Sequence, residues 1–304
     1  MKIVLRPPQR EDAASVAEVA GRFGQAYGAD HESASDIETW FDDPGLDLEH
    51  DARVAVTDDG IVGYADISDA AHEGKLLWVD LRVDPAHSDV EPTLLGFVEQ
   101  RAPVLARPGA RIKIWAPENA ESLRGLLESR GYKFDHYSIR MVAALDADPP
   151  ELVWPEGVTV RTFCRDEDVE AVYEAHQETF SDQPDFFRDP YEEWQHWSFR
   201  KPFDPELWFL AIDDSEIAGI SLCRSEFSGD PDLGWVSILG VRRPWRRRGL
   251  GLALLHHSFR ELRARGKSRV GLGVAADNPT GAVRLYERAG MSPVRKHLWY
   301  ERPV

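Results

Sequence analysis

Apolar residues recur with two different periods in the second half of the chain. Val169, Val172 and Tyr173 are spaced three or four residues apart, which predicts a helix over 166–178. A strand is predicted before this helix, at 158–161, and two more after it, at 207–213 and 216–224. The polar letters "DDSE" between these two strands predict a hairpin turn.

The stretch 234–241, "GWVSILGV", is apolar nearly throughout, which predicts a strand buried on both faces. A helix over 249–265 follows and ends at Gly266, because glycine commonly terminates helices. We then expect a strand at 269–275, a helix from the N-cap Asn278 and Pro279 to about 289, and a last strand at 295–301. These elements predict an α/β protein with a mixed sheet of the α+β kind.

The chain also repeats itself. "LRPPQREDAASVAEVA" (5–20) resembles "VRTFCRDEDVEAVYEA" (160–175), and "RVAVTDDGIVGYADI" (53–67) resembles "WFLAIDDSEIAGISL" (208–222). A later pair, 116–132 and 275–291, places Asn119 opposite Asn278. Prolines and acids near 145–157 predict a linker, so we expect two similar domains, 1–147 and 153–304.

Composition limits where the protein acts and what it binds. The 304 residues contain no apolar run of membrane-spanning length and no signal-peptide core, so we expect a cytoplasmic protein. Two cysteines give neither a disulfide framework nor a metal spacing, and no metal is expected. The net charge is −17, yet 242–269 holds ten basic residues and one acid, Glu261. A single basic strip suits one anionic ligand better than nucleic acid.

This strip opens with "GVRRPWRRRGLGLALL" (240–255), where a strand turns through glycines into a helix. The first amides of a helix lack internal partners and carry the positive end of its dipole, so the turn predicts a phosphate site. Gly249 and Gly251 allow close approach to the backbone, and arginines neutralise phosphate. The spacing fits neither a Walker A motif nor the dinucleotide fingerprint, and a solvated basic surface is the alternative interpretation.

At this motif the chain resembles the GNAT acetyltransferase superfamily. Residues 246–251 match its pyrophosphate motif, Q/R-x-x-G-x-G/A, and "DNPTGAVRLYERAGM" (277–291) matches its Asn…Tyr…Gly helix. The doubled layout resembles tandem members such as mycothiol synthase. The resemblance implies two tandem GNAT-like domains, of which the second binds acetyl-CoA as co-substrate.

The resemblance also implies which residues meet acetyl-CoA. The end of the central strand lies beside the pantetheine arm, the arginine–glycine turn meets the phosphates, and Asn278 contacts the arm. The full set is Leu239, Gly240, Val241, Arg242, Arg243, Arg246, Arg247, Arg248, Gly249, Leu250, Gly251, Leu252, Asn278 and Tyr286.

Tyr286 occupies the family's general-acid position, from which a phenol protonates the leaving thiolate. Its alternative interpretation is a core aromatic of an amphipathic helix. Trp235 replaces the basic glutamate of mycothiol synthase, which argues against that identity. We expect Trp235 and Ser237 to line the acceptor pocket instead.

The general base is therefore open. Glu226 and Asp232, in the loop before the central strand, are the catalytic candidates, with His176 or a water relay as alternatives.

The first half lacks this chemistry. Its counterpart of the turn, "DPAHSDVEPTLL" (84–95), has no arginine or glycine, and Asp89 and Glu91 would repel phosphate. Leu127 stands where Tyr286 would be. We expect this domain to be structural and to bind no acetyl-CoA.

These features favour an N-acetyltransferase that works by direct attack of a primary amine in a ternary complex. We expect a small cationic acceptor, because four acids lie in the segment that lines family acceptor pockets: Asp182, Asp185, Asp189 and Glu193. A protein lysine or N-terminal acetyltransferase and a non-catalytic acyl-CoA-binding protein are the alternatives. Neither nucleic acid nor a membrane is expected as partner, and we expect a monomer or homodimer.

Overall fold

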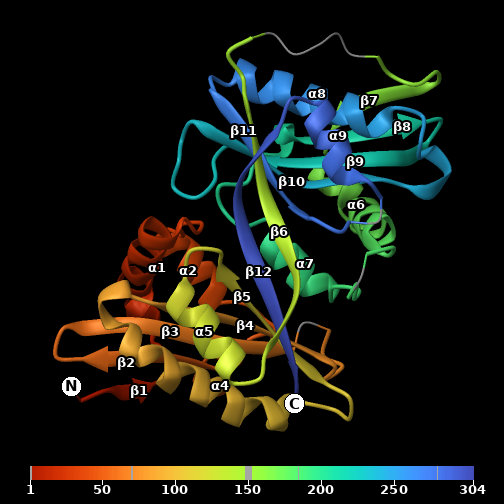
Figure 1. Cartoon of the computed structure of the whole chain (residues 1–304). Coiled ribbons are helices and arrows are strands. Elements are labelled where there is room, and N and C mark those ends of the chain that lie inside the picture. The colour runs from red at the N-terminus through yellow and green to blue at the C-terminus, as the bar shows by residue number, and fades with distance from the viewer. Residues whose placement is uncertain (1, 70, 148–152, 184, 279) are drawn as a thin grey trace. The chain divides into compact units, whose positions relative to one another are not determined.

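The computed structural model describes residues 2–69, 71–147, 153–183, 185–278 and 280–304. They form two compact units (Figure 1). Unit 1 comprises Met1–Ser138, Glu192–Lys201 and Arg295–Val304, and unit 2 comprises Ile139–Tyr191 and Pro202–Val294.

Unit 1 is built on a mixed sheet with the strand order β1-β2-β3-β4-β5-β12. Only β4 and β5 pair in parallel; the other neighbours pair antiparallel. The strands are β1 (Val4–Arg6), β2 (Ala52–Thr57), β3 (Gly60–Asp69), β4 (Leu76–Val83), β5 (Arg111–Pro117) and the part of β12 (Ser292–Pro303) that starts at Arg295. The helices are α1 (Ala13–Tyr27), α2 (Ala34–Phe41), α3 (Leu48–Asp51), α4 (Glu91–Leu105), α5 (Glu121–Ser129) and most of α7 (Tyr191–Ser198).

Unit 2 repeats this plan with the strand order β6-β11-β10-β9-β8-β7. Its strands are β7 (Val158–Thr162), β8 (Trp208–Asp213), β9 (Glu216–Arg224), β10 (Leu233–Val241), β11 (Arg269–Ala275) and the part of β6 (Lys133–Ala144) that follows Ser138. Its helices are α6 (Arg165–Phe180), α8 (Leu250–Ala264) and α9 (Ala282–Arg288). The helix α8 covers one face of this sheet and α6 the other (Figure 1), so that a Cβ on Gly219 would meet Leu254 of α8, and one on Gly240 would meet Thr179 of α6.

The last strand of each repeat completes the sheet of the other unit. The final strand β12 pairs antiparallel with β5 from His297 opposite Pro117 to Pro303 opposite Arg111. The strand β6, which ends the first repeat, neighbours β11 in unit 2. The compact units therefore differ from the two predicted domains, 1–147 and 153–304, because β12 joins the sheet of unit 1 and β6 lies beside β11. A strand can join either sheet wherever an edge has free backbone groups.

Local interactions repeat between the units, as expected for similar domains. Arg6 donates two hydrogen bonds to Asp12, at 2.6 and 2.8 Å, and Arg161 donates two to Asp168, at 2.6 and 2.7 Å. In both units this pair ties the first strand to the start of the first long helix.

Most predicted elements of the second half are confirmed, with ends shifted by a few residues. The predicted strands at 216–224 and 269–275 have the expected bounds, as β9 and β11. The predicted strand at 234–241 is not buried on both faces throughout, since Ser237 is exposed. The last helix is shorter than predicted, starting at Ala282. Pro279 and part of the expected linker, 148–152, lie outside the described residues.

Candidate active site

The central strand β10 of unit 2 separates from its parallel neighbour. It pairs with β11 only from Leu233 opposite Arg269 to Trp235 opposite Gly271, although β10 continues to Val241. Beyond that point, no described strand pairs with β10 on the β11 side, although the Val241 carbonyl accepts a hydrogen bond from Arg246 Nε at 3.0 Å. Unpaired backbone groups require a partner, so this edge is suited to an extended ligand.

A bulge interrupts β10 where the two strands separate. Trp235 pairs with Arg224 and Val236 with Cys223 on β9, whereas Ile238 pairs with Leu222. Ser237 is the extra residue, and the bulge breaks the alternation that would put it on the face of Trp235. The corresponding strand β4 of unit 1 pairs with β3 in unbroken register.

A cavity of about 850 Å³ lies where β10 and β11 separate. Twelve of the residues predicted to bind ligand line it: Ser237, Leu239, Gly240, Val241, Arg246, Arg247, Gly249, Leu250, Gly251, Leu252, Asn278 and Tyr286. Six other predicted residues do not line it: Glu226, Asp232, Trp235, Arg242, Arg243 and Arg248.

The helix α8 points its first turn at this cavity. It begins after Gly249, whose φ of 87° is left-handed, and Arg247 has a φ of 64° that a non-glycine residue adopts at a cost of about 1 kcal/mol or more. Among the described residues, none accepts a hydrogen bond from the backbone N–H of Leu250 or Gly251. These amides and the helix dipole make the turn an anion site.

Most of the arginine run is neutralised by acids of the same unit. Four of the five arginines form ion pairs at up to 3.6 Å: Arg242 with Glu178, Arg243 and Arg246 with Asp182, and Arg248 with Asp213. Arg247 forms no ion pair with any described residue. The cavity therefore receives less net positive charge from this run than its sequence suggests.

Two further arginines of the cavity were missed by the sequence reasoning. Arg284 and Arg288 lie one turn apart on α9 and both line the cavity. Their four-residue spacing places them on one face of the helix, and this spacing is the sequence feature that could have predicted them.

Tyr286 projects from the same short helix. Its side chain is only 8% exposed, it lines the cavity, and its hydroxyl makes no hydrogen bond to the described residues. Burial raises the pKa of Tyr286 to about 12. The phenol is therefore protonated at neutral pH.

Asn278 does not cap α9 directly. Its Oδ1 accepts hydrogen bonds from the backbone N–H of Thr280 at 2.9 Å and from the Thr280 hydroxyl at 2.5 Å. The helix starts three residues after the predicted position because this local turn and Gly281, with φ 76°, intervene. Asn278 nevertheless lines the cavity.

None of the candidate bases contributes to the cavity wall. Glu226 and Asp232 are exposed, and Asp232 is five residues from Ser237, about 16 Å along a strand. Burial lowers the pKa of His176 to about 4, and its ring packs edge-on against Phe180 at 4.9 Å.

Trp235 is part of a stack rather than a free wall. Its ring lies parallel to that of Phe227, with centroids 3.7 Å apart, and the guanidinium of Arg140 sits 5.5 Å from the Trp235 ring. A Cβ on Gly271 would lie 2.7 Å from the Trp235 ring. Trp235 is 7% exposed, so its own unit already supplies both the stacking partner and the cation.

Three of the four acids expected to receive a cationic acceptor have partners inside their own units. Asp182 binds Arg243 and Arg246, Asp189 accepts from Gln177 Nε2 at 2.9 Å, and Glu193 pairs with His72. Asp182 and Glu193 already have basic partners, so this segment gives less support for a cationic acceptor than its sequence suggests.

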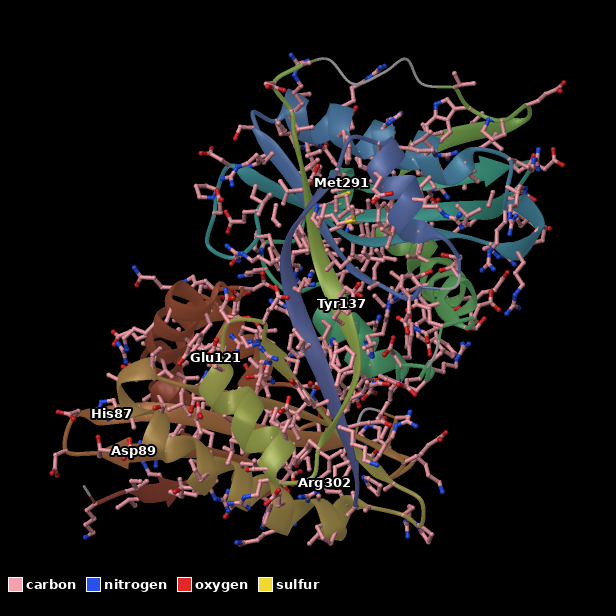
Figure 2. All side chains as sticks on the ribbon, in the orientation of Figure 1. His87, Asp89, Glu121, Tyr137, Met291 and Arg302 are labelled. Atoms are coloured by element: carbon pink, nitrogen blue, oxygen red, sulfur yellow. The ribbon has the colours of Figure 1, made fainter. Side chains whose placement is uncertain are left out.

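The corresponding turn of unit 1 is acidic. It is the 3-10 stretch Pro85–Val90, which carries His87 and Asp89 ahead of α4 (Figure 2). Asp84 before it pairs with Arg22 at 2.6 Å, and Glu91 after it is buried, which raises its pKa. The ion pair between Asp84 and Arg22 thus has the opposite order of charges from the pair between Arg242 and Glu178 in unit 2, because the acid is now on the turn and the arginine on the helix.

Comparison with known proteins identifies the family of this fold and site. Residues 169–291 match the acetyltransferase (GNAT) family. The mycothiol acetyltransferase of Streptomyces scabiei is 32% identical over 244 residues, 79% of this chain and 76% of that protein. The chain belongs to the GNAT acetyltransferase family.

Other GNAT relatives cover nearly the whole chain. The mycothiol acetyltransferase of Salinispora arenicola is 30% identical over 98% of this chain and 94% of that protein. The crystal structure of a GCN5-related N-acetyltransferase from Sphaerobacter thermophilus has a TM-score of 0.78 at 31% identity, covering 99% of this chain and 95% of that one. A tandem GNAT protein from the clavulanic acid biosynthesis pathway, at 17% identity, shares the fold with a TM-score of 0.73, covering 99% of this chain and 98% of that one.

The family assignment makes this chain an acetyltransferase of the acetyl-CoA-dependent class. Within the described ranges, no three histidine, cysteine or acidic side chains are grouped so as to hold a metal ion. No helix among the described residues is both long and apolar enough to cross a membrane.

Proposed function

We propose that this protein transfers the acetyl group of acetyl-CoA to a primary amine of a small molecule by direct attack in a ternary complex. One observation carries the proposal: a single cavity in unit 2 is lined both by the first turn of α8 and by Tyr286. Anion binding and proton donation are thus offered at one site.

The described residues fit acetyl-CoA. The edge of β10 that faces β11 would hold an extended amide-containing arm at Leu239 and Gly240, because β10 pairs with β11 only as far as Trp235. The amides of Leu250 and Gly251, with Arg246 and Arg247, would hold phosphates. Bound there, acetyl-CoA supplies an activated thioester.

Tyr286 is suited to act as the general acid. It keeps its proton at neutral pH because its pKa is about 12, and its hydroxyl is not engaged by another described residue. A phenol in this state donates a proton to a developing thiolate, which contributes about 10²–10⁴-fold to a rate.

The cavity offers no effective base. Asp182 is the only carboxylate among the described residues that line it, and hydrogen bonds from Arg243 and Arg246 lower its pKa to about 2. We therefore propose that the acceptor enters as a neutral amine and loses its proton through water after attack. Neither Glu226 nor Asp232 lines this cavity, so we assign neither of them as its base.

The acceptor class is proposed as a small-molecule primary amine, without the cationic character that the four acids first suggested. The mycothiol acetyltransferases among the relatives make the acceptor of those enzymes a second candidate. Replacement of the family's glutamate by Trp235 counts against it.

Replacing Tyr286 by Phe tests the proposal. We expect kcat on the best amine to fall about 10²-fold or more, while the Kd for CoA stays within about twofold, because only the proton donor is lost. Calorimetry on the wild type should give one CoA per chain, since the acidic turn of unit 1 would repel phosphate.

Tyr173→Phe is the matched control, since its hydroxyl donates to the Asp189 carbonyl at 2.6 Å and lies outside the cavity. Unchanged turnover in Tyr286→Phe would contradict the acid assignment. CoA binding without turnover on broad amine and peptide panels would favour a non-catalytic binder, and turnover on peptides alone would favour a protein acetyltransferase.

A further inference from the structure

We propose that Asp182 sets the affinity for the coenzyme by competing with its phosphate groups for the guanidinium group of Arg246. This inference rests on the proposed function and concerns the same cavity.

The Asp182 carboxylate bridges Arg243 and Arg246. Its Oδ1 lies 2.6 Å from Arg243 Nη2, and its Oδ2 lies 2.5 Å from Arg246 Nη1 and 3.3 Å from Arg243 Nε. A second contact also holds Arg246 in place, because its Nε donates a hydrogen bond to the Val241 carbonyl at 3.0 Å. The guanidinium of Arg246 therefore already uses Nε and Nη1 in hydrogen bonds within the protein.

Asp182 stands inside the phosphate site rather than beside it. It lines the same cavity as Arg246, Arg247 and Gly249. It follows α6 directly, and Arg243 also donates to the neighbouring Ser181 hydroxyl at 2.9 Å. With its pKa near 2, the carboxylate is ionised at any physiological pH.

The other acids that pair with the run lie elsewhere. Arg242 pairs with Glu178 at 2.6 Å and with Glu216 at 3.5 Å, and Arg248 pairs with Asp213 at 3.6 Å. None of these five residues lines the cavity. Asp182 is thus the one acid partner of the run, among the described residues, that shares a cavity with the α8 amides.

A phosphate that approaches Arg246 must therefore replace a carboxylate ligand or share the guanidinium with it. Exchange of one anion for another gains less than binding to a free guanidinium, and a carboxylate left nearby repels the phosphate. The exchange also releases fewer salt ions than phosphate binding to unpaired arginines would. The consequence is a weaker and less salt-sensitive grip on the coenzyme.

Asp182→Asn tests this assignment, with Glu178→Gln as the matched control. Each substitution removes one negative charge that pairs with an arginine of the run, and both positions lie near the C-terminal end of α6. Only Asp182 lines the cavity. Calorimetric titrations with CoA and with pantetheine, which lacks phosphates, are run at two salt concentrations. Thermal unfolding verifies that each variant is folded.

We expect Asp182→Asn to bind CoA about tenfold more tightly than wild type at about 0.05 M salt, and about threefold at about 0.5 M, because salt screens the restored guanidinium charge. Pantetheine affinity should be unchanged, and Glu178→Gln should stay within about twofold of wild type, because its charge lies outside the cavity.

Equal CoA affinity in Asp182→Asn and Glu178→Gln would overturn the assignment while leaving the proposed function intact. Weaker binding by Asp182→Asn would also overturn it, because the carboxylate would then act by positioning the arginines. Absence of CoA binding in all three proteins would overturn the proposed function and this inference together.

Discussion

At the scale of single residues, the cavity of unit 2 contains a phenol that can donate a proton, Tyr286, but no carboxylate that can act as a general base. Burial keeps Tyr286 protonated, and two guanidinium groups keep Asp182 ionised and weakly basic. The pH dependence of the reaction should therefore report the acceptor amine rather than the enzyme.

We predict that kcat/KM rises with pH up to the pKa of the acceptor amine and shows no descending limb below about pH 10, because Tyr286 loses its proton only near pH 12. Profiles with two amines of different pKa should be displaced by the difference between those pKa values. An ascending limb at the same pH for both amines would instead reveal an enzyme base, and would reopen the question of Glu226, Asp232 and His176.

At the scale of elements, the position of α6 against β10 depends on the absence of a side chain at Gly240. A Cβ there would lie 2.4 Å from Thr179 Oγ1 and 2.8 Å from Thr179 Cβ, and Thr179 is itself buried. The close contact also brings the end of α6, and with it Asp182, to the cavity.

Gly240→Ala should lower the free energy of unfolding by about 1–3 kcal/mol, because α6 must move to accommodate the methyl group. Thermal unfolding measures the effect. Gly125→Ala, in the exposed part of α5, is the control: no atom lies within 4 Å of its new Cβ, and better helix propensity should stabilise it by up to about 1 kcal/mol. A Gly240→Ala variant as stable as wild type would show that α6 is not held by this contact.

At the scale of the whole molecule, each unit depends on a strand from the other repeat. The segment Arg295–Val304 belongs to unit 1, and its Tyr300, 1% exposed, packs into the core there. Figure 2 marks Arg302 on this last strand, where it pairs with Glu99 at 2.7 Å. The C-terminal residues thus stabilise the unit that begins the chain.

Truncation after Val294 should therefore destabilise unit 1 selectively, by about 3 kcal/mol or more, because a fully buried aromatic side chain is lost. Hydrogen exchange should show deprotected amides in β5, with β8 and β9 retaining their protection. Removal of Pro303 and Val304 alone is the control. Equal protection of β5 in the truncated and intact chains would contradict the dependence of unit 1 on the last strand of the chain.

The sequence by itself determined the elements, the repeat and the turn that starts α8. These follow from local signals, namely the hydrophobic period, the glycines at 249 and 266, and the paired motifs around Arg6 and Arg161. Resemblance to the GNAT family located twelve residues of the cavity, of which ten lie in the contiguous stretch 237–252 and the other two are Asn278 and Tyr286.

Only the tertiary structure decided which sheet the last strands join, where β10 leaves β11, and which arginines carry free charge. Each depends on pairing between distant segments: β12 with β5, the bulge at Ser237 against β9, and Asp182 with arginines some sixty residues away. The composition of the run shows five positive charges, but neutralisation depends on which acids the fold brings within reach, and no local period encodes that.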